Sequence, residues 1–158
     1  SAGYAGYHKP MDNRLMMKCV LALLCVAAAL PIHARECVPA MKEGWVRLPP
    51  ATMPMMAGFG RIANPCPMPV VIVSASSPSF GDVSIHETRN VDGVNRMREV
   101  GQLRIAPDDS VTLKPGGMHL MLMQPHAPLK EGSKVVVKFK LQDGREILAE
   151  LMVRKPSP

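Results

Sequence analysis

The sequence is poor in aromatic residues and in helix-forming stretches, and each shortage excludes a class of protein. Phe, Trp and Tyr together make up 4% of the 158 residues. The basic residues behind the formal net charge of +6 are scattered, whereas a nucleic-acid surface needs a basic cluster interleaved with aromatic rings. The 16 prolines and 12 glycines interrupt the chain too often for a three-turn amphipathic helix. We therefore expect neither a nucleic-acid-binding protein nor a helical domain.

Long apolar runs are also missing, apart from one near the start at residues 19–30. Basic residues precede this run and the small residue Ala34 follows it. That order is typical of a secretory signal peptide, and about twelve apolar residues are too few to span a bilayer stably. A buried helix is the alternative, but the run lacks polar spacing. We expect a leader at residues 1–34, cleavage near Ala34, and a single periplasmic domain at 35–158 with no stable membrane insertion.

Beyond the leader only two cysteines remain, Cys37 and Cys66. An even pair in an exported domain favours a structural disulfide. A thiolate metal site or a redox site is the alternative, but it needs closely spaced or His-paired cysteines, and no histidine lies between these two. We predict a Cys37–Cys66 bridge that holds the start of the domain to a later turn.

What the domain does contain is a series of short segments that alternate apolar and polar residues, separated by turn residues. Such a series predicts an all-β sandwich or barrel. Asp92-Gly93 and Asp143-Gly144 are dipeptides favoured where both central residues of a turn need positive φ, so each predicts a tight hairpin. The expected strands are 45–49, 58–64, 70–76, 82–89, 94–100, 110–114, 118–123, 134–141 and 146–153.

The first of these hairpins brings a histidine and a methionine together. With Asp92-Gly93 as a two-residue loop, His86 and Met97 become diagonal neighbours on one face. In the segment MHLMLM, alternation places His119 and Met121 together on one face, with the leucines on the other as the better core candidates. Thioether and imidazole donors are uncharged and soft, and they suit Cu(I) rather than calcium, magnesium or zinc. We predict a Cu(I) site made of these four residues.

Most of the remaining sulfur has a simpler interpretation. The sequence contains 13 methionines, and methionine commonly fills irregular cores. Met53, Met55 and Met56 leave two interpretations open, because a sulfur-rich loop could flank a copper site or simply pack. His126, in QPHAP, is interpreted as a solvated loop residue.

The four predicted donors read H-x10-M-x21-H-x-M, and this pattern resembles the signature of the extracytoplasmic copper chaperone family often called PCuAC. The surrounding segments WVRLPP, MPMMAGFGRIAN, ASSPSFGDVSIHET and LKPGGMHLMLM are also similar to the family. The resemblance implies a cupredoxin-like Greek-key β-barrel that binds one Cu(I) per chain through His86, Met97, His119 and Met121. The Cys37–Cys66 bridge is not part of the family signature.

The same resemblance implies a function in copper supply. Family members deliver copper to the dinuclear centre of cytochrome c oxidase, often beside a thioredoxin-like partner, so we expect a monomeric metallochaperone that acts by ligand exchange. Copper storage or tolerance in the periplasm is the main alternative. A blue-copper electron carrier is a second, but it needs a cysteine thiolate beside its histidines. No nucleophile motif or paired carboxylates favour an enzyme.

Overall fold

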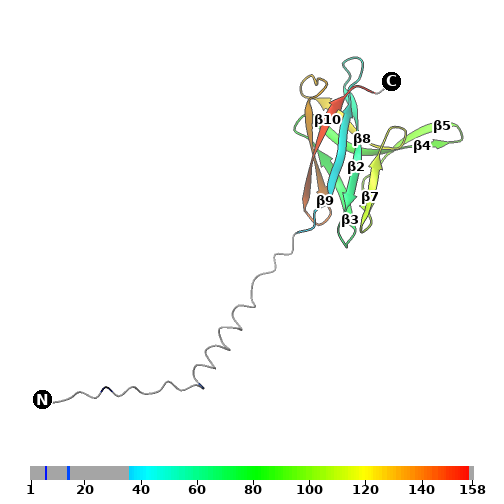
Figure 1. The fold of residues 1–158 in the computed structure, drawn as a ribbon. Helices are drawn as coiled ribbons and strands as arrows, with labels where there is room; N and C mark the ends of the chain where they lie inside the picture. The colour runs from blue at the N-terminus through cyan, green and yellow to red at the C-terminus, as the bar shows by residue number, and fades with distance from the viewer. Residues whose placement is uncertain (1–5, 7–13, 15–35, 157–158) are drawn as a thin grey trace. The chain divides into compact units, whose positions relative to one another are not determined.

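Ten strands run through the described part of the chain, all of them within the unit Cys37–Pro158 (Figure 1). The computed structural model describes residues 6, 14 and 36–156, so the predicted signal peptide lies almost wholly outside the described residues. Across the part that is described, no helix is long and apolar enough to cross a membrane. The strands are β1 (Ala40–Arg47), β2 (Met55–Asn64), β3 (Val70–Ser76), β4 (Phe80–Val91), β5 (Val94–Glu99), β6 (Leu103–Ile105), β7 (Asp109–Leu113), β8 (Met118–Pro125), β9 (Lys134–Leu141) and β10 (Glu146–Arg154).

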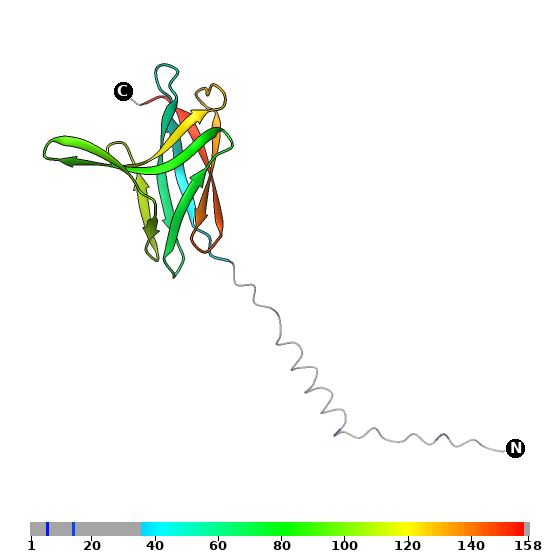
Figure 2. The ribbon, with the colours of Figure 1, turned by 180° about the vertical axis from the view of Figure 1, so that it is seen from behind.

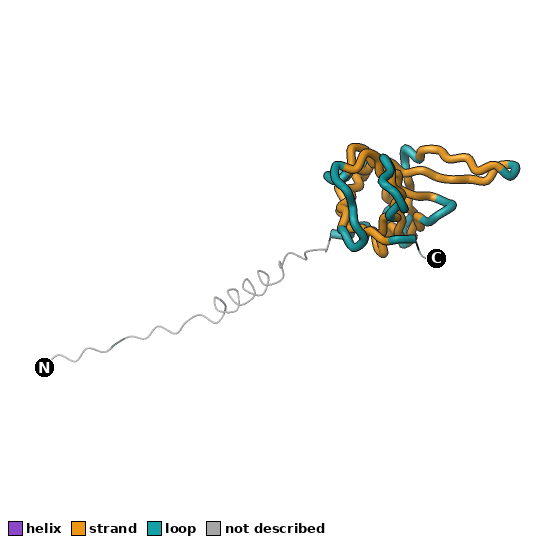
Figure 3. Tube along the Cα trace, turned by 90° about the horizontal axis from the view of Figure 1, so that it is seen from above, coloured by secondary structure: helices purple, strands orange, loops and turns teal. Residues whose placement is uncertain are grey.

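Seven of these strands close a barrel. They pair in the order β4-β8-β2-β1-β10-β9-β3, and the bridge between Ala75 of β3 and Val83 of β4 completes the circle. Seen from above, the closed wall and the hairpin that leaves it are both visible (Figure 3). β5 continues the sheet beyond β4, β6 pairs with β3, and β7 pairs with the second half of β2. The all-β barrel expected from the sequence is confirmed.

Every second side chain of the barrel strands points inward and forms the barrel interior. In β9, KVVVKFKL, the residues Val135, Val137, Phe139 and Leu141 are buried, while the lysines between them point outward. β10 alternates in the same way along all nine of its residues. Aliphatic side chains dominate this core, so the shortage of aromatic residues is met by many small apolar contacts rather than a few large ones.

The hairpin of β4 and β5 projects from the barrel as an arm (Figures 1 and 2). Every residue of β5 is exposed, so the arm has no hydrophobic core of its own. Its turn has Asp92 at φ 52° and Gly93 at φ 80°, the positive values that a type I′ turn requires. The side-chain oxygen of Asn90 accepts a hydrogen bond from the Gly93 N–H at 3.0 Å. The predicted two-residue loop is confirmed.

The predicted hairpin at Asp143-Gly144 is present between β9 and β10, but its turn differs from the expected one, and one strand was missed. In the Asp143-Gly144 hairpin only Gly144 has positive φ, at 91°, and Leu141 donates its N–H to the Arg145 carbonyl at 2.8 Å. The loop therefore contains three residues, and three-residue loops need positive φ only at their last position. The short strand β6 was not predicted, because three residues give too little alternation to recognise.

The predicted disulfide is present and ties the start of β1 to the end of β2. The Cα atoms of Cys37 and Cys66 are 5.5 Å apart. Beside the bridge, the buried Asn64 accepts the Cys66 N–H at 3.1 Å and donates to the Met68 carbonyl at 2.8 Å. The same amide donates to the Ala106 carbonyl at 3.0 Å. This end of the barrel is therefore held by one covalent link and a satisfied buried polar group.

Candidate metal centre

The two predicted histidine ligands lie side by side on neighbouring strands. His86 of β4 is the direct cross-strand partner of His119 of β8, and their ring centroids are 6.2 Å apart. Residues opposite each other in an antiparallel pair project to the same face. The sequence placed these histidines in two separate strands, and the tertiary structure makes those strands neighbours.

The two predicted methionine ligands lie on the same face. Met97 is paired with Thr88, two residues from His86, as the turn-based register predicted. Met121 is two residues beyond His119 on β8. Side chains two residues apart share a face and are separated by about 6.6 Å. All four side chains therefore leave the outer face of the β5-β4-β8 part of the sheet, although their joint coordination of an ion remains a prediction.

The opposite face of these strands explains why this register is stable. Leu120, Leu122 and Ile85 alternate with the predicted ligands and are buried in the barrel. Burying each of them contributes about 1.5–3 kcal/mol relative to leaving it exposed. A slip of one residue would move all three leucine and isoleucine side chains into water and turn the histidines inward. The core thus determines which side chains are available outside.

Hydrogen bonding prepares His119 to act as a donor through one particular nitrogen. Its Nδ1 lies 3.0 Å from the carbonyl oxygen of Gly117. Because a carbonyl only accepts, Nδ1 carries the proton in this contact and Nε2 keeps its lone pair. The same carbonyl accepts the Thr88 N–H at 3.1 Å, so it also joins β4 to the start of β8. A backbone carbonyl that orients an imidazole in this way is common behind metal-binding histidines.

His86 is held differently and leaves one nitrogen without a partner. Its Nε2 lies 3.0 Å from the hydroxyl oxygen of Ser84. Its Nδ1 is buried, and no described residue hydrogen-bonds to it. A buried polar atom without a hydrogen-bond partner costs about 1–3 kcal/mol of stability. When the Nδ1 atom of His86 carries a lone pair, a bound metal ion could supply the missing partner. The sequence analysis missed Ser84, although its position two residues before His86 on the same strand places both side chains on one face and could have indicated the contact.

Charged side chains lie on both faces of the arm: Glu99 is opposite His86 on the face of the predicted ligands, and a group of ion pairs lies on the other face. Glu87 binds Arg89 at 2.8 Å and Arg98 at 3.0 Å. The hydrogen bonds from the Arg89 and Arg98 guanidinium groups, in that order, lower the pKa of the Glu87 carboxyl below its ordinary value. Exposed ion pairs of this kind add little stability, but the Glu87–Arg98 pair links β4 to β5 at the base of the arm, whereas Arg89 is on β4 with Glu87. The predicted donors are two thioethers, which do not ionise, and two imidazoles, which are uncharged in their neutral form.

The four side chains differ in their access to solvent. Met97, on the arm, is 54% exposed, whereas His119 is 8% exposed. His86 and Met121 are intermediate. Within the described residues, no group of three or more His, Cys, Asp or Glu side chains is placed to hold a metal ion. A metal site at this position therefore depends on the thioether groups.

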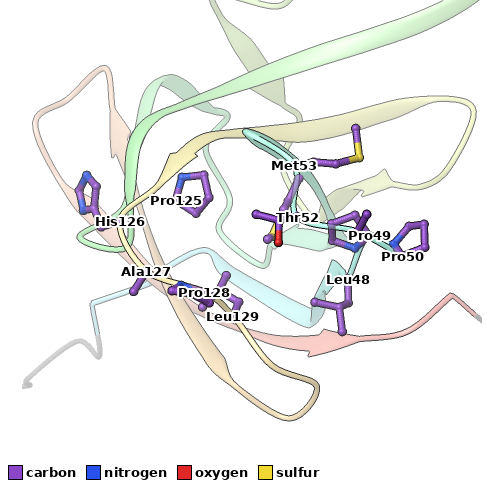
Figure 4. Close-up of a pocket in the computed structure, with 12 residues that line it drawn as sticks. Leu48, Pro49, Pro50, Thr52, Met53, Pro125, His126, Ala127, Pro128 and Leu129 are labelled. Atoms are coloured by element: carbon purple, nitrogen blue, oxygen red, sulfur yellow. The ribbon is translucent and has the colours of Figure 1, made fainter.

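The remaining methionines fall into two groups. Met56 packs in the core, while Met53 and Met55 are exposed, so the packing interpretation holds only for Met56. His126 is an exposed residue whose Nδ1 lies 2.9 Å from the Pro78 carbonyl oxygen, as expected of a loop residue. A pocket of about 490 Å³ separates Met53 from His126, and Figure 4 shows the thioether and the ring on opposite sides of it. These two side chains do not form a common site.

The comparison with protein families identifies the chain. A family model described as "Putative lipoprotein LpqE-like" matches residues 40–153. The chain belongs to the LpqE-like family. This family is related to PCuAC, so the resemblance drawn from the sequence is confirmed. The match covers the barrel and the arm.

Two relatives of this LpqE-like chain are identical to it at about a third of the aligned positions. "Putative lipoprotein Lxx21020" of Leifsonia xyli subsp. xyli is 33% identical over 105 residues, which cover 66% of this chain and 62% of that protein. "Uncharacterized protein RP573" of Rickettsia prowazekii is 32% identical over 88 residues, or 55% of this chain and 49% of that protein. The chain thus matches about half to three fifths of the length of these relatives.

Solved structures of PCuAC domains share the fold. The CuI-DR1885 solution structure from Deinococcus radiodurans is 27% identical, with a TM-score of 0.57 over 85% of this chain and 86% of that one. The apo PCuAC domain from PmoF1 is 20% identical, with a TM-score of 0.62 over 73% and 92%. The copper-bound PCuAC domain from PmoF2 is 17% identical, with a TM-score of 0.59 over 73% and 92%. The cupredoxin-like architecture of the LpqE-like chain is therefore established.

Proposed function

We propose that this protein is an exported copper chaperone that binds one Cu(I) through His86, Met97, His119 and Met121. The observation that carries the proposal is the strand register, which sends two imidazole and two thioether side chains out of one face. Relatives with the same fold include a copper-bound PCuAC domain and a Cu(I) form of DR1885, which supports copper as the metal.

The donor set supports the cuprous ion in particular. Thioether sulfur is soft and imidazole is of intermediate softness, so the set suits Cu(I) and offers little to calcium or magnesium. Four uncharged donors also favour a monovalent ion over a divalent one, because none of the four carries a negative charge; Glu99, which is opposite His86 on β5, is not among the proposed ligands. Zinc sites usually contain cysteine, histidine or carboxylate ligands alone.

The gradient of exposure supports transfer by ligand exchange. Met97, on the projecting arm, is the most exposed of the four residues, and His119 is the most buried. An acceptor protein could displace the Met97 thioether first while the histidines still hold the ion. We propose the copper-accepting subunit of cytochrome c oxidase as the recipient, with a thioredoxin-like protein as a further partner. The disulfide supports an oxidising compartment such as the periplasm.

The two alternatives differ in their support. In the described part of the chain both cysteines are joined in the bridge, so neither supplies the thiolate of a blue-copper centre. A storage protein could use the same donors as a chaperone. The two functions differ in whether copper leaves for a recipient.

Competition titration with a Cu(I) chelator tests the site. Met97→Leu and Met121→Leu should each lower Cu(I) affinity about tenfold or more, since loss of a metal's outer-shell partner alone typically costs 10–100-fold. Met68→Leu is the control, because Met68 is an exposed loop residue outside the site. X-ray absorption on the Cu(I)-loaded protein should count two nitrogen and two sulfur donors. Unchanged affinity in both site variants would refute the ligand set.

Deletion of the gene tests the recipient. If the protein delivers copper to cytochrome c oxidase, the deletion should lower the copper content of the oxidase while growth in excess copper stays normal. The reverse pattern, with a full oxidase and sensitivity to copper, would identify storage or tolerance instead.

A further inference from the structure

Two methionines that the proposed site does not use, Met55 and Met123, are direct cross-strand partners on β2 and β8. At the adjacent position the Gln124 N–H donates to the Pro54 carbonyl at 2.7 Å. Hydrogen-bonded and non-hydrogen-bonded positions alternate in an antiparallel pair, so Met55 and Met123 form the closer, non-hydrogen-bonded kind, with Cα atoms about 4.5 Å apart. The two thioether side chains therefore leave the same face from neighbouring points.

This pair adjoins the proposed site. Met123 is two residues beyond Met121, so both lie on the outer face, about 6.6 Å apart along β8. Ala57 is opposite Met121 and contributes only a methyl group to this part of the surface. Asp82 is the partner of Met123 on β4 and places a carboxylate beside it. Met121, Met123 and Met55 are therefore successive neighbours on the outer face.

Packing does not account for the exposed methionines at the start of β2. Met55 is 37% exposed, and Met53, two residues earlier, is 43% exposed. Met56, the next residue of β2, is the methionine that packs in the core. Figure 4 shows the Met53 side chain directed away from His126, at the opposite side of the pocket. Met53 lines that pocket together with the core-facing Met56, so the strand register places only Met55 and Met123 side by side.

We propose that Met55 and Met123 bind a second monovalent soft cation, Cu(I) or Ag(I). Two thioethers without an imidazole make a weaker site than the four-residue site beside it. Exchange of one thioether for another across Met123 and Met121 would let an ion pass between the two sites without a change in its charge. The inference rests on the proposed function only for the identity of the cation.

Titration with Ag(I) and with Cu(I), followed by NMR of methionine methyl groups labelled with carbon-13, tests this second site. We expect two steps. The first should shift the methyl resonances of Met97 and Met121, and the second, weaker step should shift those of Met55 and Met123. The double variant Met55→Leu/Met123→Leu should lose the second step and keep the first. Leucine preserves volume and hydrophobicity, so the fold should be retained.

Met152→Leu is the matched control, because Met152 is also 37% exposed but lies on β10. It should keep both steps. A single step in the unaltered protein, or a second step that persists in the double variant, would overturn the second site while leaving the proposed function intact. Shifts at Met55 and Met123 without any at Met97 and Met121 would support the second site and refute the proposed one.

Discussion

Removal of the Cys37–Cys66 bridge should lower the free energy of unfolding by an amount that the structure allows us to calculate. The two cysteines are 29 residues apart in sequence. Opening a loop of that length restores conformational entropy to the unfolded chain worth about 3.6 kcal/mol at 25 °C. Because Cys66 is buried, the variant Cys37→Ala/Cys66→Ala also loses some packing, so this value is the smaller end of the expected loss.

Urea unfolding followed by the fluorescence of Trp45, the one tryptophan of the chain, measures this loss. Trp45 packs against Phe59 at a centroid distance of 4.7 Å and so reports on the barrel. With a urea m-value of about 1–3 kcal/mol/M, a loss of about 3.6 kcal/mol should lower the midpoint by roughly 1–4 M. A reductant should lower the midpoint of the unaltered protein to a similar extent and leave the double variant unchanged.

A loss of less than about 1 kcal/mol in the free energy of unfolding of the double variant, well below the usual range for a native disulfide, would refute this reasoning. So would a reductant that has no effect on the unaltered protein while the bridge is shown to open. Copper affinity should be the same with and without the bridge, because the proposed ligands lie on β4, β5 and β8, and neither cysteine belongs to those strands.

Two further predictions concern polar groups. Asn64→Ala leaves buried backbone groups without partners and should cost about 1–3 kcal/mol in urea unfolding; an unchanged midpoint would show that water replaces the amide. NMR titration should give Glu87 a pKa below the ordinary glutamate value, and Arg98→Gln should raise it. Because the folded-state pKa is lowered, the ion pairs of Glu87 stabilise the arm above the unfolded-state pKa and lose that effect as pH falls through the folded-state pKa. Identical titrations in both proteins would contradict the pairing.

The sequence predicted local geometry well where a short-range rule applies. The dipeptide Asp92-Gly93 dictates a type I′ turn, and that turn determines the whole register between His86 and Met97. Alternation in MHLMLM separated the buried leucines from His119 and Met121 because side chains in a strand have a period of two. At Asp143-Gly144 the dipeptide did not give a two-residue turn, because Gln142 is also part of the loop.

Contacts between distant segments could not be predicted in this way. Nothing local indicates that β4 should pair with β8, yet this pairing sets His86 beside His119, which lies 33 residues later. The closeness of Met55 and Met123 has the same origin, in the pairing of β2 with β8. The short strand β6 also emerges only in the folded chain.

The sequence by itself determined which side chains could serve as soft donors, which face of each strand they occupy, and how one hairpin aligns. The tertiary structure decided which strands are neighbours, how exposed each donor is, and which methionines remain outside the core. The reason is physical: turn geometry and strand alternation act over a few residues, whereas strand order follows from closing a barrel around a shared apolar interior.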